Sequence, residues 1–174
     1  EAAPEPAAET EPAAETEPPV EPVPGPAVPA ANGRCVLISG GDRGIGAAAA
    51  RAFWQAGYRV AVLYHTHAEA AAALEKALPG LLAVQCDVAS RASCEVAFHT
   101  VQQAVGHVDV LVSNAGIAQQ KLFTDITPEE WQHMLDVNLS GAFHLCRSVT
   151  KTMIRKELRR CKSAVLDDYT VRPL

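Results

Sequence analysis

The sequence has no hydrophobic run of the roughly 18 residues that a membrane-spanning helix needs, and no polybasic face stands out in it. Its net charge is −5. We therefore expect neither a membrane nor a nucleic acid as a partner. The five cysteines form no C-x-x-C motif and have no regular spacing, which favours thiols in a reducing, cytoplasmic compartment over a disulfide framework or a metal site. They are Cys35, Cys86, Cys94, Cys146 and Cys161.

Residues 1–33 lack the composition of a folded core. They hold nine of the twelve prolines, seven glutamates and no basic residue, and the hexapeptide EPAAET occurs twice in succession. Such a segment cannot bury enough apolar surface to offset its loss of entropy, so we expect a disordered, polyproline-like tail. It could act as a solvated spacer or as a tether that a partner recognises. Because the chain begins with Glu1 and not Met, we also expect a fragment or a processed product.

From residue 34 onward, short apolar runs alternate with helical patterns. This alternation predicts a parallel sheet with helices on both faces. The predicted strands are 35–38, 59–64, 81–86 and 108–113, and the predicted helices are 45–56, 68–78, 90–106 and 127–156. Thr127 and Glu130 form a capping box at the start of the last helix. Its predicted buried stripe is Trp131, Leu135, Leu139, Ala142 and Leu145.

A glycine-rich turn follows the first predicted strand directly. It begins at Ser39 and contains Gly40, Gly44 and Gly46. Glycines let the backbone approach a phosphate, and the N–H groups of the first helical turn point toward it. The turn therefore predicts an anion site, with a glycine-rich surface turn that binds nothing as the alternative.

Three further motifs occur in the same order as in one known family. Cys86-Asp87-Val88 ends the third strand, Ser113-Asn114-Ala115-Gly116 ends the fourth, and Asn138 lies in the capped helix. Together with the glycine turn, they resemble the motifs of the short-chain dehydrogenase/reductase family, with serine at positions 39 and 113 as departures. The resemblance spans about residues 33–156 and is similar to the bacterial 3-oxoacyl-[acyl-carrier-protein] reductase branch.

The resemblance implies a Rossmann-like, doubly wound parallel α/β sheet. The implied strand order is 3-2-1-4, within a partial domain at 34–156 and followed by an unrelated segment at 157–174. It also implies a homo-oligomer that binds a nicotinamide nucleotide. The implied cofactor-binding residues are Ser39, Gly40, Asp42, Arg43, Gly44, Ile45, Gly46, His65, Thr66, Asp87, Val88, Asn114, Ala115 and Gly116.

Some of these residues have specific implied roles. Asp87 and the Val88 backbone would hold the adenine, and Asn114 would tie neighbouring strands together. Asn138 matches the asparagine of the family's catalytic tetrad, whose backbone carbonyl binds a water that supports the catalytic lysine.

The residues around the second strand favour NADP(H) over NAD(H). NAD-specific relatives place an acidic residue after this strand, whereas this chain reads Tyr64-His65-Thr66-His67. Arg43 in the glycine turn supplies a positive charge that suits a 2′-phosphate. An alternative interpretation treats His65 and His67 as ordinary surface histidines, and an H-x-H pattern alone does not indicate a metal.

The catalytic serine, tyrosine and lysine of the family have no counterpart here. By family spacing, the tyrosine and lysine positions fall beyond residue 174. Tyr169 is followed four residues later by Pro173, and Ser163 precedes an apolar run where the family's serine follows one. We expect an altered reading frame or splice at this end, and a chain that binds nucleotide at best. The alternatives are an interaction protein that uses its tail and an exposed dimerisation helix, and a gene fragment without function.

Overall fold

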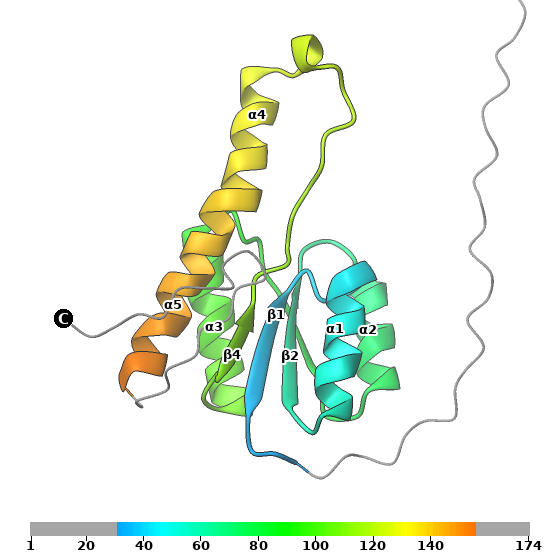
Figure 1. The fold of residues 1–174 in the computed structure, drawn as a ribbon, viewed down its shortest axis with the longest axis vertical. Helices are drawn as coiled ribbons and strands as arrows, with labels where there is room; N and C mark the ends of the chain where they lie inside the picture. The colour runs from blue at the N-terminus through cyan, green and yellow to red at the C-terminus, as the bar shows by residue number, and fades with distance from the viewer. Residues whose placement is uncertain (1–30, 156–174) are drawn as a thin grey trace, which may run out of the picture.

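The structure, a computed structural model, describes residues 31–155. Its centre is a four-stranded parallel sheet in the order β3-β2-β1-β4 (Figure 1). The strands are β1 (Cys35–Ser39), β2 (Arg59–Tyr64), β3 (Leu82–Gln85) and β4 (Val110–Val112). The predicted fold class and strand order are therefore confirmed. Most of the predicted tail and the whole of segment 157–174 lie outside the described residues.

Helices cover both faces of the sheet. The helices α1 (Gly44–Gln55) and α2 (Ala68–Ala77) cover one face, and α3 (Arg91–Val105) and α5 (Gly141–Arg155) cover the other (Figure 1). Side chains of a strand point alternately to the two faces. In β1, Val36 and Ile38 accordingly join the core beneath α1 and α2, while Leu37 joins the core beneath α3 and α5. All three side chains are fully buried. Burial of each contributes about 1.5–3 kcal/mol to the stability of the fold relative to an exposed side chain.

The capped helix begins as the sequence predicts. The Thr127 hydroxyl accepts a hydrogen bond from the Glu130 N–H (3.2 Å), and the Glu130 carboxylate accepts one from the Thr127 N–H (3.1 Å). This capping box opens α4 (Pro128–Leu135) after a single 3₁₀ turn, η1 (Phe123–Asp125). Glu130 also pairs with Lys121, and the hydrogen bonds from Lys121 and the Thr127 backbone lower the pKa of the Glu130 carboxyl.

The predicted stripe of the capped helix is partly wrong. Leu145 is buried, but Trp131 is 48% exposed and Leu139 is 67% exposed. A π-helical segment, η2 (Asp136–Ser140), lies between α4 and α5. Because a π turn holds an extra residue, it changes which side chains face the sheet. The buried apolar side chains of η2 and α5 are Val137, Leu145, Val149 and Met153.

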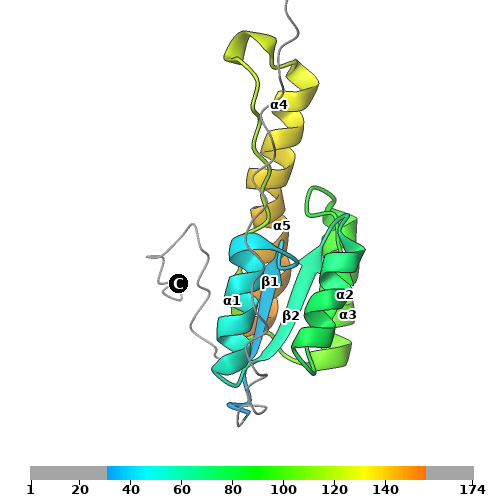
Figure 2. The same cartoon turned by 90° about the vertical axis from the view of Figure 1, so that its right-hand side faces the viewer.

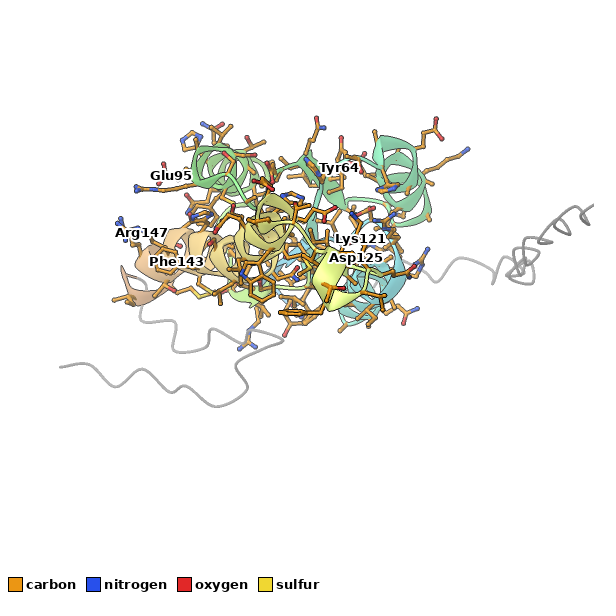
Figure 3. All side chains as sticks on the ribbon, turned by 90° about the horizontal axis from the view of Figure 1, so that it is seen from above. Tyr64, Glu95, Lys121, Asp125, Phe143 and Arg147 are labelled. Carbon is orange, nitrogen blue, oxygen red and sulfur yellow. The ribbon has the colours of Figure 1, made fainter. Side chains whose placement is uncertain are left out.

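Helix α4 projects past the carboxyl ends of the strands (Figures 1 and 2). None of its residues is fully buried. Seen from this end, Phe143 and Arg147 of α5 lie on the opposite side of the molecule from Lys121 and Asp125 of the segment before α4 (Figure 3). Within residues 31–155, no helix is both long and apolar enough to cross a membrane.

Candidate functional site

The glycine turn brings the start of α1 directly against the end of β1. A Cβ atom at Gly46 would lie 2.0 Å from the Gly40 carbonyl oxygen, so only glycine permits this approach. Gly40 has a φ of +60° and Gly44 a φ of +53°, which L side chains rarely adopt. Arg43 is the N-cap of α1 and makes no side-chain capping bond. The N–H groups of the first turn have no partner within the helix, so they can serve an anion.

Hydrogen bonds join the glycine turn to the end of β4. The Ser39 hydroxyl accepts from the backbone N–H groups of Asn114 and Ala115, each at 3.0 Å. The Asn114 side-chain amide donates to the carbonyl oxygens of Ser39 (3.1 Å) and Gly40 (3.0 Å). Asn114 therefore ties the ends of the neighbouring strands β1 and β4 together, as the sequence predicted. Ser39 is fully buried in this role.

The turn after β3, residues 86–90, lies at the same end of the sheet as the glycine turn. The Asp87 carboxylate accepts a hydrogen bond from the Ala89 N–H at 3.0 Å, which fixes its side chain close to the backbone. The Val88 side chain contacts α5 so closely that a Cβ at Gly141 would lie 2.9 Å from Val88 Cγ2. Nearby, the Cys86 and Cys94 sulfurs lie 3.9 Å apart. The hydrogen bond with Cys86 and burial raise the pKa of the Cys94 thiol, so Cys94 stays protonated.

Asn138 of η2 fixes the segment after β4. Its side-chain oxygen accepts a hydrogen bond from the Ile117 N–H (2.8 Å), and its amide donates to the Ile117 carbonyl (2.9 Å). Asn138 Oδ1 also lies close to Gly116, because a Cβ atom added at Gly116 would be only 3.2 Å from it. Asn138 thus holds the loop that leads from the sheet toward α4.

These elements enclose a cavity of about 300 Å³ at the carboxyl ends of the strands. Many of the predicted cofactor-binding residues line it: Gly40, Asp42, Arg43, His65, Thr66, Asp87, Val88, Asn114, Ala115 and Gly116. The lining does not include Ser39, Gly44, Ile45, Gly46 or Asn138. Ser39 and Gly46 shape the turn, Ile45 is 81% exposed, and Asn138 holds the loop.

Several lining residues were not predicted. They are Leu63, Tyr64, His67, Cys86, Ile117, His133 and Val137. For His67 the signal was the H-x-H pattern, which admits a surface interpretation. His133 comes from α4 and has no local sequence signal, because its position depends on how that helix leaves the sheet.

Asp42, Arg43 and His67 form a charged cluster at one edge of the cavity. Arg43 Nη1 lies 2.7 Å from His67 Nε2, and His67 Nδ1 lies 3.7 Å from Asp42 Oδ2. The Asp42 side chain is only 6% exposed, whereas those of Arg43 and His67 are 68% and 46% exposed. Among residues 31–155, no three His, Cys, Asp or Glu side chains are grouped to hold a metal ion.

A cavity at the carboxyl ends of parallel strands, beside a glycine turn and a helix N-terminus, is a common nucleotide-binding arrangement. The family model described as "short chain dehydrogenase" matches residues 34–160. This chain belongs to the short-chain dehydrogenase family. The family resemblance that the sequence motifs indicated is therefore confirmed, and members of this family bind nicotinamide nucleotides.

The curated relatives of this chain include reductases of 3-oxoacyl thioesters. The chain is 38% identical to an acetoacetyl-CoA reductase of Shinella zoogloeoides over 120 residues, which is 69% of this chain and 49% of that protein. It is 36% identical to the 3-oxoacyl-[acyl-carrier-protein] reductase MabA of Mycobacterium bovis over 127 residues, or 73% of this chain and 48% of that protein. The chain spans about half the length of the curated relatives it matches.

Solved structures give the same fold. The crystal structure of gox2181 matches with a TM-score of 0.68 at 29% identity, and the match covers 75% of this chain and 52% of the gox2181 chain. A Serratia marcescens short-chain dehydrogenase/reductase, the F98L/F202L mutant, has a TM-score of 0.67 at 27% identity, with coverage of 71% and 52%.

Proposed function

We propose that this chain binds NADP(H) in the cavity and is the nucleotide-binding part of a reductase that acts on 3-oxoacyl thioesters. The observation that carries the cofactor preference is the exposed guanidinium of Arg43 at the cavity edge. It faces a β2–α2 connection, residues 65–67, that contains no carboxylate. A guanidinium donates charge-assisted hydrogen bonds to phosphate, and the absent acidic residue removes the usual acceptor for a free ribose hydroxyl.

The remaining parts of the cavity suit the other parts of a dinucleotide. The first turn of α1 offers N–H groups to a pyrophosphate. The end of β3, with Asp87 and Val88, would bind the adenine. Asn114, Ala115 and Gly116 leave room for the cofactor beside the end of β4, because their side chains are short or tied back to the glycine turn. The 3-oxoacyl thioester substrate class is carried over from the two named reductases.

We further propose that these 174 residues bind the cofactor without turning over substrate. Bound NADPH would supply the hydride for carbonyl reduction, but the carbonyl oxygen also needs a general acid. The family uses a Y-x-x-x-K pair for this, and no tyrosine of this sequence has a lysine four residues later. Reduction of acetoacetyl-CoA by the purified chain should therefore equal the rate in buffer, and turnover above that rate would contradict this part of the proposal.

The cofactor proposal is tested by titrating the purified chain with NADPH and NADH and following the nucleotide fluorescence. We expect tighter binding of NADPH. The Arg43→Ala variant should lose about 1–2 kcal/mol of binding free energy for NADPH and little for NADH, as expected for one charge-assisted contact. The matched control is Arg51→Ala, which removes an exposed arginine from α1 outside the cavity lining. Equal affinities for both nucleotides, or tighter binding of NADH, would contradict the preference.

A second proposed property is self-association through one face of α4, η2 and α5. Trp131, Leu139 and Phe143 are 48%, 67% and 60% exposed and follow one another at intervals of four or eight residues. Apolar side chains that recur on one exposed helix face mark an interaction site. We propose that a second copy of this chain covers this face.

A further inference from the structure

The distances within the charged cluster of Asp42, Arg43 and His67 define which groups donate and which accept hydrogen bonds. A guanidinium only donates hydrogen bonds, so His67 Nε2, at 2.7 Å from Arg43 Nη1, accepts with its lone pair. In this arrangement the ring proton lies on Nδ1. That nitrogen lies 3.1 Å from the Thr66 hydroxyl and 3.7 Å from Asp42 Oδ2.

The cluster also contains an unsatisfied buried acceptor. Asp42 Oδ2 is buried and has no hydrogen-bond partner among the described residues, and Arg43 Nε is 3.9 Å away from it. A buried carboxylate oxygen without a partner is costly. A positively charged imidazole at the position of His67 would compensate the negative charge of the buried Asp42 carboxylate. The free cluster, with one carboxylate, one guanidinium and a neutral imidazole, has no net charge.

We propose that His67 is a second residue that selects for the 2′-phosphate, and that it takes up a proton from solvent when the phosphate binds. This inference rests on the proposed preference for NADP(H). It predicts that the preference for the 2′-phosphorylated nucleotide increases as the pH falls. His67 is also the N-cap residue of α2 and makes no capping bond with its side chain, so the ring is available to a ligand beside a helix N-terminus, which favours anions.

The proton uptake follows from the hydrogen bonds that must change. A phosphate at this edge would accept hydrogen bonds from the N–H groups of Arg43. His67 Nε2 would then no longer accept a hydrogen bond from Arg43 Nη1. The ring can donate from Nε2 to the phosphate and keep its Nδ1 proton toward Thr66 and Asp42 only if it gains one proton. The product is an imidazolium between a dianionic phosphate and a buried carboxylate. The other titratable groups that line the cavity are Tyr64, His65, Cys86, Asp87 and His133, and Glu69 lies in the first turn of α2.

The sign of the proton exchange separates this mechanism from binding by arginine alone. A phosphomonoester has a second pKa near about 6, so at about pH 7 a small fraction still carries a proton. A guanidinium favours the dianion and would make the phosphate release that proton. Net uptake of a proton therefore requires a group of the protein that gains one, and a histidine is the side chain suited to this pH range.

The test is calorimetric titration of the full chain with adenosine 2′,5′-bisphosphate, with adenosine 5′-monophosphate as the comparison ligand. Titrations at about pH 7 in buffers with different ionisation enthalpies give the number of protons exchanged on binding. We expect net uptake of a fraction of a proton for the bisphosphate and less for the monophosphate. The His67→Gln variant should lose this uptake or change to release. The control is His99→Gln, an exposed histidine of α3 outside the cavity lining, which should behave as the original chain.

A pH series on the unmodified chain gives a second measurement that needs no variant. The affinity ratio of bisphosphate to monophosphate should rise roughly three- to tenfold from about pH 8.5 to about pH 6.5. If the bisphosphate does not bind more tightly than the monophosphate, the proposed NADP(H) preference fails, and this inference fails with it. If the bisphosphate binds more tightly but with no proton uptake, or with uptake that His67→Gln retains, the preference stands and the role of His67 is wrong.

Discussion

Asn138 and Ile117 exchange two hydrogen bonds, at 2.8 and 2.9 Å, between the side chain of one and the backbone of the other. The pair joins η2 to the segment that leaves β4, two parts of the chain 21 residues apart. The family role that the sequence implied for Asn138 concerns its backbone carbonyl. Its side chain has a further role in this structure, because it fixes the cavity wall that contains Ile117.

Replacing Asn138 by Ala should therefore destabilise the fold and loosen the cavity. We expect a loss of about 1–2 kcal/mol in the free energy of unfolding, since both hydrogen bonds disappear and the Ile117 backbone groups must find water. Urea unfolding measures this loss. The control is Gln132→Ala, whose side-chain amide makes one exposed bond, to Asp136. Equal stability of the two variants would show that the Asn138 bonds contribute nothing measurable.

Gly46→Ala should weaken nucleotide binding by displacing the glycine turn. The added methyl group would lie 2.0 Å from the Gly40 carbonyl oxygen and 2.7 Å from the Asn114 side-chain nitrogen. The turn must move, so we expect at least a roughly tenfold weaker affinity for NADPH, or about 1.4 kcal/mol. Ala48→Ser adds one atom on the exposed side of the same helix and should bind as the original chain does. Unchanged affinity of Gly46→Ala would mean that the nucleotide does not use this turn.

Cys35 should make the fold less stable in alkaline solution. Burial, with a smaller contribution from Asp109 and partly offset by Arg59, raises the pKa of its thiol from 9.0 to about 11. The unfolded chain loses this proton first. The resulting stability is complete below pH 9 and disappears as the pH rises through 11. Because two pKa units correspond to about 2.7 kcal/mol, the unfolding free energy should fall by about 2–3 kcal/mol more than in Cys35→Ala.

Chemical denaturation at a series of pH values from about 8 to about 11 measures this difference. Other groups titrate in this range, but they are shared by both chains and cancel in the comparison. Parallel pH profiles of the original chain and Cys35→Ala would show that the buried thiol has an ordinary pKa.

Self-association should depend on the exposed face of η2 and α5. Changing Leu139 or Phe143 to Lys places a charge where apolar side chains are 67% and 60% exposed, and should shift the chain toward the monomer. Size-exclusion chromatography with light scattering at micromolar concentration gives the mass. Gln132→Lys introduces the same charge at an exposed polar position and should leave the association unchanged. A monomeric original chain would contradict the proposed interface.

The sheet and the glycine turn could be predicted because local signals determine them. The strand at Cys35–Ser39 is uniformly buried, and the glycines that follow it are required by backbone geometry, so short sequence motifs identify both. Asn114 could be predicted for the same reason, since its neighbours in the chain mark the end of a strand. The capping box at Thr127 depends on only four consecutive residues.

The rest of the site depends on contacts that no local pattern encodes. Trp131 was assigned wrongly to the core because α4 projects past the sheet. Leu139 was assigned wrongly because the π-helical segment Asp136–Ser140 interrupts the regular helical period. His67 belongs to the cluster because α2 begins beside the glycine turn, a relationship between residues 24 positions apart. Its sequence context, two histidines around a threonine, fits an ordinary exposed loop equally well.

The central claim is that nicotinamide nucleotide binds in the cavity at the carboxyl ends of the strands. Amide chemical shifts of the isotope-labelled chain, followed by NMR during addition of NADPH, test it most directly. The account predicts saturable shifts at Gly40 and Arg43, in the first turn of α1, and at Asp87 and Val88, with the outer face of α5 unchanged. Saturable shifts confined to other surfaces, or no saturable shift at all, would contradict it.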